Sequence, residues 1–145
     1  MIHVAILNKA WKLLDKIKNG EKSIESRWYK IKAKPWDIVR EGDIIYFKDS
    51  GEPITVKAII SRVVQYDNLN HDLVMQILNQ YHKEICLENR YTKFYENRKY
   101  CILIFLKEIE ILNNPIIFDK SGFGISSAWI CISNINEFNK RIKRK

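Results

Sequence analysis

Apolar residues fall in short runs along this chain, and their spacing separates strand-like from helix-like segments. Continuous or alternating apolar runs predict β-strands at residues 2–7, 44–48, 54–64, 100–111, 115–118 and 128–132. Apolar residues at helical spacing predict one helix that is capped by Asn8 and ended by Gly20, and a second over residues 73–81. A further helical stretch is predicted at residues 88–99.

Turns and loops connect these segments. Gly42 belongs to a turn before the strand at 44–48, and residues 49–53 read as a hairpin connection. Residues 28–39 combine alternating lysines with a proline, which predicts an irregular loop. The alternation of the long strand slips at residues 59–60, and this indicates a bulge or a barrel corner.

The stretch from residue 20 to residue 27 places several charged side chains close together. If residues 23–27 form a strand, Ser23, Glu25 and Arg27 point to one face, while Ile24 and Ser26 point to the other. A strand face that is wholly polar fits the wall of a cleft better than a core.

Gly20, Lys22, Glu25 and Arg27 have the spacing G-x-K-x-x-E-x-R, which resembles the signature of the ASCH family in the PUA-like superfamily. Three later features fit the same order, namely Gly42-Asp43, Lys99-Tyr100 and Ala128-Trp129. The resemblance implies an α+β fold, a PUA-like mixed β-barrel of about five or six strands with flanking helices. It also implies RNA binding and, in some members, hydrolysis.

The length of 145 residues predicts a single domain over residues 1–145, with a basic tail at 140–145. The formal net charge of +8 indicates an anionic partner. Together with the resemblance, this predicts single-stranded or modified RNA. The alternative interpretation is that the charge serves solubility alone.

Three cysteines without a C-x-x-C pair favour the reducing cytoplasm over a disulfide framework. We expect no signal peptide, because the first apolar run is short, and no membrane span. His82, Glu84 and Cys86 are potential metal ligands, but no second cluster completes a tetrahedral site, so we predict neither a metal nor a cofactor. The oligomeric state stays open.

The charged stretch has two interpretations. As a binding site, Arg27 would grip a phosphate or carboxylate through its planar guanidinium. Glu25 would stay ionised between two cations, where it could orient Lys22 or accept a hydrogen bond from a base or ribose. The alternative is a structural ion-pair cluster that closes the barrel.

Further nucleic-acid contacts are predicted around this stretch. Trp28 and Tyr29 could stack on bases while Lys30 contacts phosphate, although tryptophan is more often a core residue. Lys120 opens a glycine-containing loop that could lie against a phosphate. The basic residues 140–145 would add only nonspecific attraction.

An enzyme is the alternative function. Some small ASCH proteins remove an acyl group from acetylated cytidine, and another branch cleaves single-stranded RNA. In the amidohydrolases the lysine of the signature is catalytic, and a threonine nucleophile stands where this chain has Glu25. Lys22 and Glu25 would therefore be the catalytic residues of a hydrolase, but the missing threonine argues against that activity.

Overall fold

The structure is a computed structural model that describes residues 1–87 and 95–144. Its strands are β1 (Ile2–Leu7), β2 (Ile24–Tyr29), β3 (Ile44–Asp49), β4 (Ile54–Tyr66), β5 (Tyr100–Phe118), β6 (Trp129–Ile132) and β7 (Ile142–Arg144). Its helices are the short 3₁₀ turn η1 (Lys9–Trp11), α1 (Leu13–Lys18), α2 (His71–Ile85) and α4 (Ile135–Lys140).

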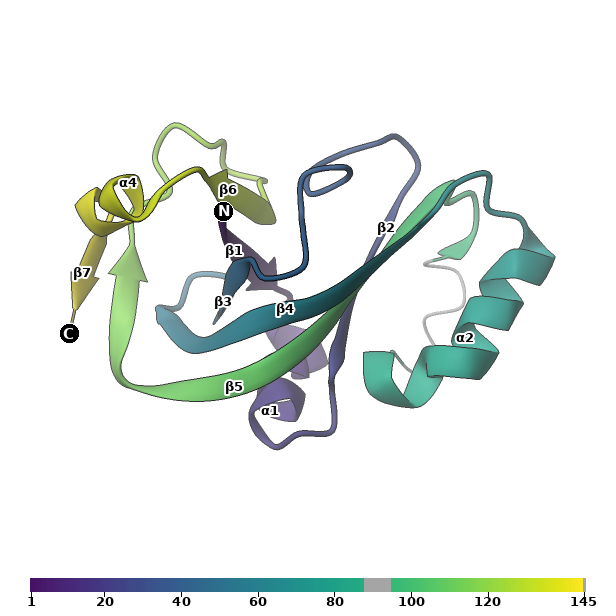
Figure 1. Cartoon of the computed structure of the whole chain (residues 1–145), viewed down its shortest axis with the longest axis horizontal. Coiled ribbons are helices and arrows are strands. Elements are labelled where there is room, and N and C mark those ends of the chain that lie inside the picture. Colours follow the sequence, from purple (N-terminus) through teal and green to yellow (C-terminus); the bar gives the residue numbers. More distant parts are fainter. Residues whose placement is uncertain (88–94, 145) are drawn as a thin grey trace.

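The strands form one strongly curled sheet in the order β2-β5-β4-β3-β1-β6, with β7 paired to β5 (Figure 1). β1 and β3 are parallel and the other pairs are antiparallel. The predicted α+β fold with a mixed, barrel-like sheet is therefore confirmed. β2 and β6 are the two ends of the six-strand path, so backbone pairing does not close the barrel.

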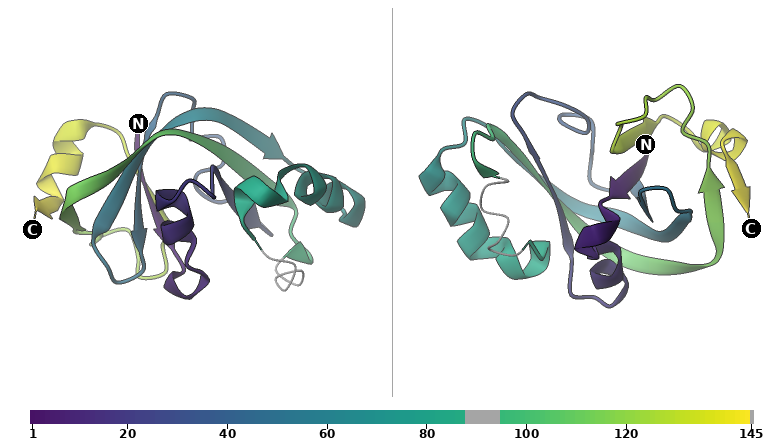
Figure 2. Two further views of the ribbon diagram at one scale, coloured as in Figure 1. Left: turned by 90° about the horizontal axis from the view of Figure 1, so that it is seen from below. Right: turned by 180° about the vertical axis from the view of Figure 1, so that it is seen from behind.

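Each helix covers a different part of the sheet (Figure 2). α1 buries Leu13, Leu14 and Ile17 in the core on the inside of the curl. α4 contributes Phe138 to a second core at the end that carries β7. α2 packs its apolar side on the outer face of β2 and β5, where it forms a third core. Both faces of β5 are therefore buried at residues 101–104, which explains the continuous apolar run there.

Three segments differ from the sequence-based expectation. Residues 28–29 continue β2 instead of beginning a loop, because they pair with the first two residues of β5. Residues 100–118 form one strand instead of two, because the pairing with β4 shifts around residues 112–115 without ending. Residues 142–144 of the predicted basic tail form a strand, because they pair with β5 as β7, and the side chains of Lys143 and Arg144 stay exposed.

The predicted irregularity at residues 59–60 is confirmed, since the pairing of β4 with β5 shifts register on both sides of it. The strand predicted at 23–27 is also confirmed as β2. Most of the helix predicted at 88–99 lies outside the described residues. Among the described helices, none is both long enough and apolar enough to cross a membrane.

Candidate functional site

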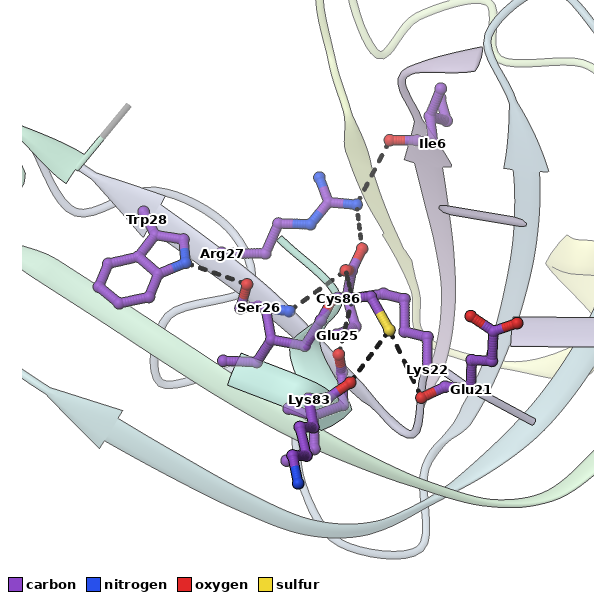
Figure 3. Close-up of polar contacts among 11 residues, drawn as sticks. Ile6, Glu21, Lys22, Glu25, Ser26, Arg27, Trp28, Lys83 and Cys86 are labelled. Carbon is purple, nitrogen blue, oxygen red and sulfur yellow. Dashed lines mark hydrogen bonds and ion pairs between the residues drawn. The ribbon is translucent and has the colours of Figure 1, made fainter. Parts of the chain in front are cut away.

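β2 presents two different faces, as its alternation predicts. Ile24 and Trp28 belong to the apolar core beneath α2. Glu25 and Arg27 lie on the opposite face, and Arg27 reaches across to the backbone of β1 (Figure 3). The polar face therefore points into the gap where the curled sheet does not close.

Lys22 is buried at the base of this gap, with 1% of its surface exposed. Its Nζ donates to the carbonyl oxygens of Ile24 and Ile85, both at 2.7 Å, and lies 3.3 Å from Glu25 Oε1. An ammonium has three protons, so these partners use its full capacity. Burial lowers the pKa of Lys22, while the charge of Glu25 opposes that shift. Since Ile85 ends α2, Lys22 also satisfies a carbonyl at the C-terminus of that helix.

Glu25 lies between the two cations and is also buried. Oε1 accepts from the backbone N–H of Ser26 at 3.2 Å, and Oε2 accepts from Arg27 Nη2 at 2.9 Å. Burial by itself would raise the pKa of Glu25, but Arg27 and Lys22 bring the pKa below its usual value. The carboxylate is therefore ionised near neutral pH and is a weak base there.

Arg27 joins β2 to the opposite end of the sheet. Nη2 donates to the Ile6 carbonyl and Nη1 to the Ala128 carbonyl, both at 3.3 Å, and the guanidinium carbon lies 5.1 Å from the centre of the Trp129 ring. Together with its bond to Glu25, Arg27 uses three of its five N–H donors. Within the described part of the chain the other two make no hydrogen bond, and 13% of the side chain is exposed.

A cavity of about 260 Å³ opens beside these three residues. Its polar part consists of Asn8, Lys22, Glu25, Ser26 and Arg27, and the remaining walls are largely apolar. They are formed by Ile6, Leu7, Trp11, Leu13, Trp28, Tyr29, Leu87 and Ala128. The sequence left open whether the signature residues line a cleft or pair with one another, and the structure combines the two arrangements. A few polar groups in a mostly apolar cavity are typical of sites for small molecules.

Two predicted stacking residues have different environments. Trp28 is 3% exposed, its ring meets Tyr95 edge-on at 4.6 Å, and its Nε1 donates to Ser26 Oγ. Trp28 borders the cavity, but it belongs to the core that α2 covers on this side of β2, so a stacking role does not fit its buried ring. Tyr29 lines the cavity, and its hydroxyl donates to the Lys34 carbonyl at 2.8 Å.

The two predicted lysines lie outside the cavity. Lys30 follows Tyr29 directly and is exposed. Lys120 is separated from the cavity and lines a neighbouring hollow, where its Nζ donates to the carbonyls of Ile125 and Ser127. The cavity and the hollow share Ile6, Leu7, Asn8 and Ala128 in their walls, so Lys120 lines the adjoining space and not the cavity itself. Lys30 lines neither of the two.

A second polar network, which the sequence did not predict, holds the Trp129 ring that packs against Arg27. Trp129 Nε1 donates to His3 Nδ1 at 3.0 Å, and His3 Nε2 lies 2.8 Å from Asp43 Oδ2. An indole N–H only donates, so Nδ1 must accept and Nε2 carries the proton that goes to Asp43. Burial lowers the pKa of His3 despite the nearby Asp43. The only signal in the sequence is a histidine inside the otherwise apolar strand at residues 2–7.

Two residues of the weak metal-ligand pattern, His82 and Cys86, contact backbone carbonyls. Cys86 Sγ lies 3.1 Å from the Lys83 carbonyl oxygen and 3.4 Å from that of Glu21, and its single proton can go to either one. His82 Nδ1 lies 3.1 Å from the Leu78 carbonyl. Across residues 1–87 and 95–144, no three His, Cys, Asp or Glu side chains gather closely enough to hold a metal ion.

Comparison with solved structures identifies the fold. The crystal structure of the ASCH protein from Zymomonas mobilis matches with a TM-score of 0.65 at 16% sequence identity, and the match covers 96% of this chain and 91% of that one. Two single-residue variants of that protein match with TM-scores of 0.64 and 0.63, at 16% and 17% identity. Each covers 91% of this chain, and 90% and 88% of its own.

No family model matches the sequence, and no curated protein does. The fold is nevertheless that of ASCH domain proteins, and the predicted resemblance is confirmed at this level. At this identity the likeness extends to the fold alone, so function has to be argued from the site.

Proposed function

We propose that this protein binds single-stranded or modified RNA and seats one base in the cavity beside Lys22, Glu25 and Arg27. Arg27 carries this proposal, because it lines an apolar cavity with two N–H donors that no described residue uses. Its guanidinium is held in place by two backbone carbonyls and a carboxylate. Such a fixed donor group suits the recognition of one particular acceptor pattern on a ligand.

The composition of the cavity fits a nucleobase. A base is apolar on its two faces and polar along its edges. Trp11, Tyr29 and Leu87 offer apolar or aromatic contacts for the faces. A carboxylate has about four acceptor positions, and Glu25 uses three of them on Lys22, Ser26 and Arg27. The remaining position can accept from an amino group or a ribose hydroxyl.

The charge of the molecule supports the choice of RNA. The net charge is +8, and exposed lysines precede or follow residues that line the cavity. Lys9, Lys12 and Lys30 are such neighbours of the lining residues. A single strand is required, because a base must leave its stack to enter a cavity. The three free cysteines favour the cytoplasm as the location.

One observation favours the hydrolase alternative: Lys22 is a buried lysine with a lowered pKa beside a ligand-sized cavity. Two others weigh against it. All three protons of Lys22 have partners. Glu25 has a lowered pKa and is a poor base for activating a water. Binding without turnover is therefore the function that the geometry supports best.

Fluorescence anisotropy with short, labelled single-stranded RNAs tests the proposal. Arg27→Gln should weaken binding about tenfold or more, since a charge-assisted contact is lost. Arg62→Gln is the matched control, because Arg62 is exposed, lies outside the cavity and also packs 5.1 Å from an aromatic ring. Equal losses in the two variants would show that the cavity is not the binding site. Wild-type protein that binds no RNA would refute the proposed function.

A further inference from the structure

His3 is a fully buried polar side chain in the otherwise apolar strand β1. Its imidazole has one partner on each nitrogen. Nδ1 accepts from Trp129 Nε1 at 3.0 Å, and Nε2 donates to Asp43 Oδ2 at 2.8 Å. The centres of the His3 and Trp129 rings lie 5.5 Å apart, and Trp129 is itself buried. The neutral imidazole is therefore a fixed link between Asp43 and the indole.

Trp129 and the residue before it hold Arg27 from one side. The Trp129 ring lies 5.1 Å from the guanidinium carbon, and the Ala128 carbonyl accepts from Arg27 Nη1 at 3.3 Å. The Ala128 carbonyl also accepts from the backbone N–H of Ile6 at 2.9 Å, which fastens this segment to β1. The two carbonyl bonds of Arg27 are longer than typical N–H···O bonds. The position of the Trp129 ring therefore contributes to the orientation of Arg27, and Arg27 in turn lines the cavity.

Protonation of His3 removes the acceptor of the indole N–H. An imidazolium carries a proton on both ring nitrogens, so Nδ1 would point a second donor at Trp129 Nε1. Turning the ring over restores nothing, because neither nitrogen then accepts. Trp129 must either leave its position or keep a buried N–H without a partner, and the second choice is costly.

Several charged groups lie around His3. Burial is the main cause that lowers the pKa of His3, and Asp43 opposes this shift. The N-terminal ammonium of Met1 lies 3.2 Å from the Asp43 carboxylate, and the backbone N–H of Arg40 donates to it at 2.9 Å. The residues that pair with His3 on the two neighbouring strands are uncharged, namely Ile45 of β3 and Cys131 of β6, whose thiol has a pKa raised by burial. A test must therefore separate the imidazole from Met1 and Asp43.

We infer that His3 positions Arg27 through Trp129, so that proton uptake by His3 weakens ligand binding in the cavity. The neutral imidazole holds the indole, the indole packs on the guanidinium, and the guanidinium lines the cavity. In mildly acidic solution this series of contacts is broken at its first bond. The effect on RNA rests on the proposed function, whereas the coupling between His3 and Arg27 does not.

Anisotropy titrations at constant salt, from about pH 8 to about pH 5, test the effect on RNA. The RNA carries no terminal phosphate, because such a group titrates at about pH 6 itself. Wild-type affinity should fall about three- to tenfold over this range, as expected for the loss of one hydrogen bond. In His3→Gln, which keeps Met1 and Asp43, the affinity should not follow pH. Trp129→Phe should be equally insensitive, because it keeps a ring beside Arg27 but has no N–H for His3 to hold.

Three results would overturn the inference, once circular dichroism has shown that the protein is folded at each pH. The first is a wild-type affinity that does not change with pH. The second is tighter binding at low pH, which one added positive charge would cause without any change at Arg27. The third is wild-type pH dependence in His3→Gln or Trp129→Phe, because another group would then be responsible.

Nuclear magnetic resonance follows the same contacts without RNA. The indole N–H signal of Trp129, identified by its loss in Trp129→Phe, should shift as His3 takes up its proton, and the Arg27 Nε–H signal should shift at the same pH. An Arg27 signal that stays constant while His3 titrates would contradict the coupling. If both signals shift but no RNA binds at any pH, the proposed function fails and the coupling stands. If RNA binds equally well at every pH, the inference fails and the proposed function stands.

Discussion

Replacing Glu25 with glutamine removes the one negative charge that lies between Lys22 and Arg27 in the cavity wall. Glutamine is close to glutamate in size, so the change removes charge and leaves little empty space. Lys22 would keep the carbonyls of Ile24 and Ile85 as partners but would lose its counter-ion in a fully buried position. The variant therefore leaves a buried charge uncompensated.

Breaking a buried ion pair from one side costs about 3–5 kcal/mol. For a domain of this length such a loss lowers Tm by roughly 10 °C or more. The size of the loss should depend on pH, because both partners titrate. In Glu25→Gln the folded-state pKa of Lys22 falls further below its unfolded value near 10.4, so the variant recovers stability as the pH rises toward that value. In the wild type the folded-state pKa of Glu25 lies below its unfolded value, so the wild-type advantage shrinks as the pH falls below about 4.3.

Urea unfolding followed by tryptophan fluorescence, from acid to alkaline pH, measures both effects. Glu137→Gln is the matched control, because Glu137 is 45% exposed and lies 3.8 Å from Arg141 in a surface pair. Such pairs contribute about 0–1 kcal/mol, so the control should be nearly neutral at every pH. A loss below about 1 kcal/mol in Glu25→Gln, or a larger loss that stays constant with pH, would refute the assignment of a buried, charged Lys22–Glu25–Arg27 cluster.

The remaining expectations concern binding, catalysis and pH. Arg27→Ala should weaken RNA binding about tenfold, and a large fall in Tm with unchanged affinity would favour a purely structural Arg27. Wild-type affinity for RNA should fall steeply as salt rises, and a flat salt series would contradict phosphate contacts. The purified protein should release no cytidine from acetylated cytidine, and turnover that disappears in Lys22→Ala would establish the hydrolase. The free energy of unfolding should decline as the pH falls below about 6.5, the pKa of an unfolded histidine, because the folded-state pKa of His3 lies below that value. His3→Gln should flatten this part of the stability–pH curve. An unchanged curve would contradict a neutral His3 that accepts from Trp129.

The sequence by itself determined the local geometry of the site. Period-two alternation places Glu25 and Arg27 on one face of β2 and Ile24 on the other, because side chains of a strand alternate regardless of what covers them. Gly20 marks the end of the first helical segment, and its φ of +85° requires a conformation that glycine adopts without strain. The apolar run at the start of β5 identifies its buried segment, residues 101–104, in the same way.

Only the tertiary structure decided which of these residues are buried and which partners they have. Trp28 looked available for stacking, but α2 covers its face of β2. Lys22 finds a carbonyl 63 residues away at the end of α2, and Arg27 finds one 101 residues away at Ala128. His3 gave no functional signal, because its neighbour Trp129 comes from a distant segment. Alternation depends on adjacent residues alone, whereas desolvation and pairing depend on which segments the curled sheet brings together.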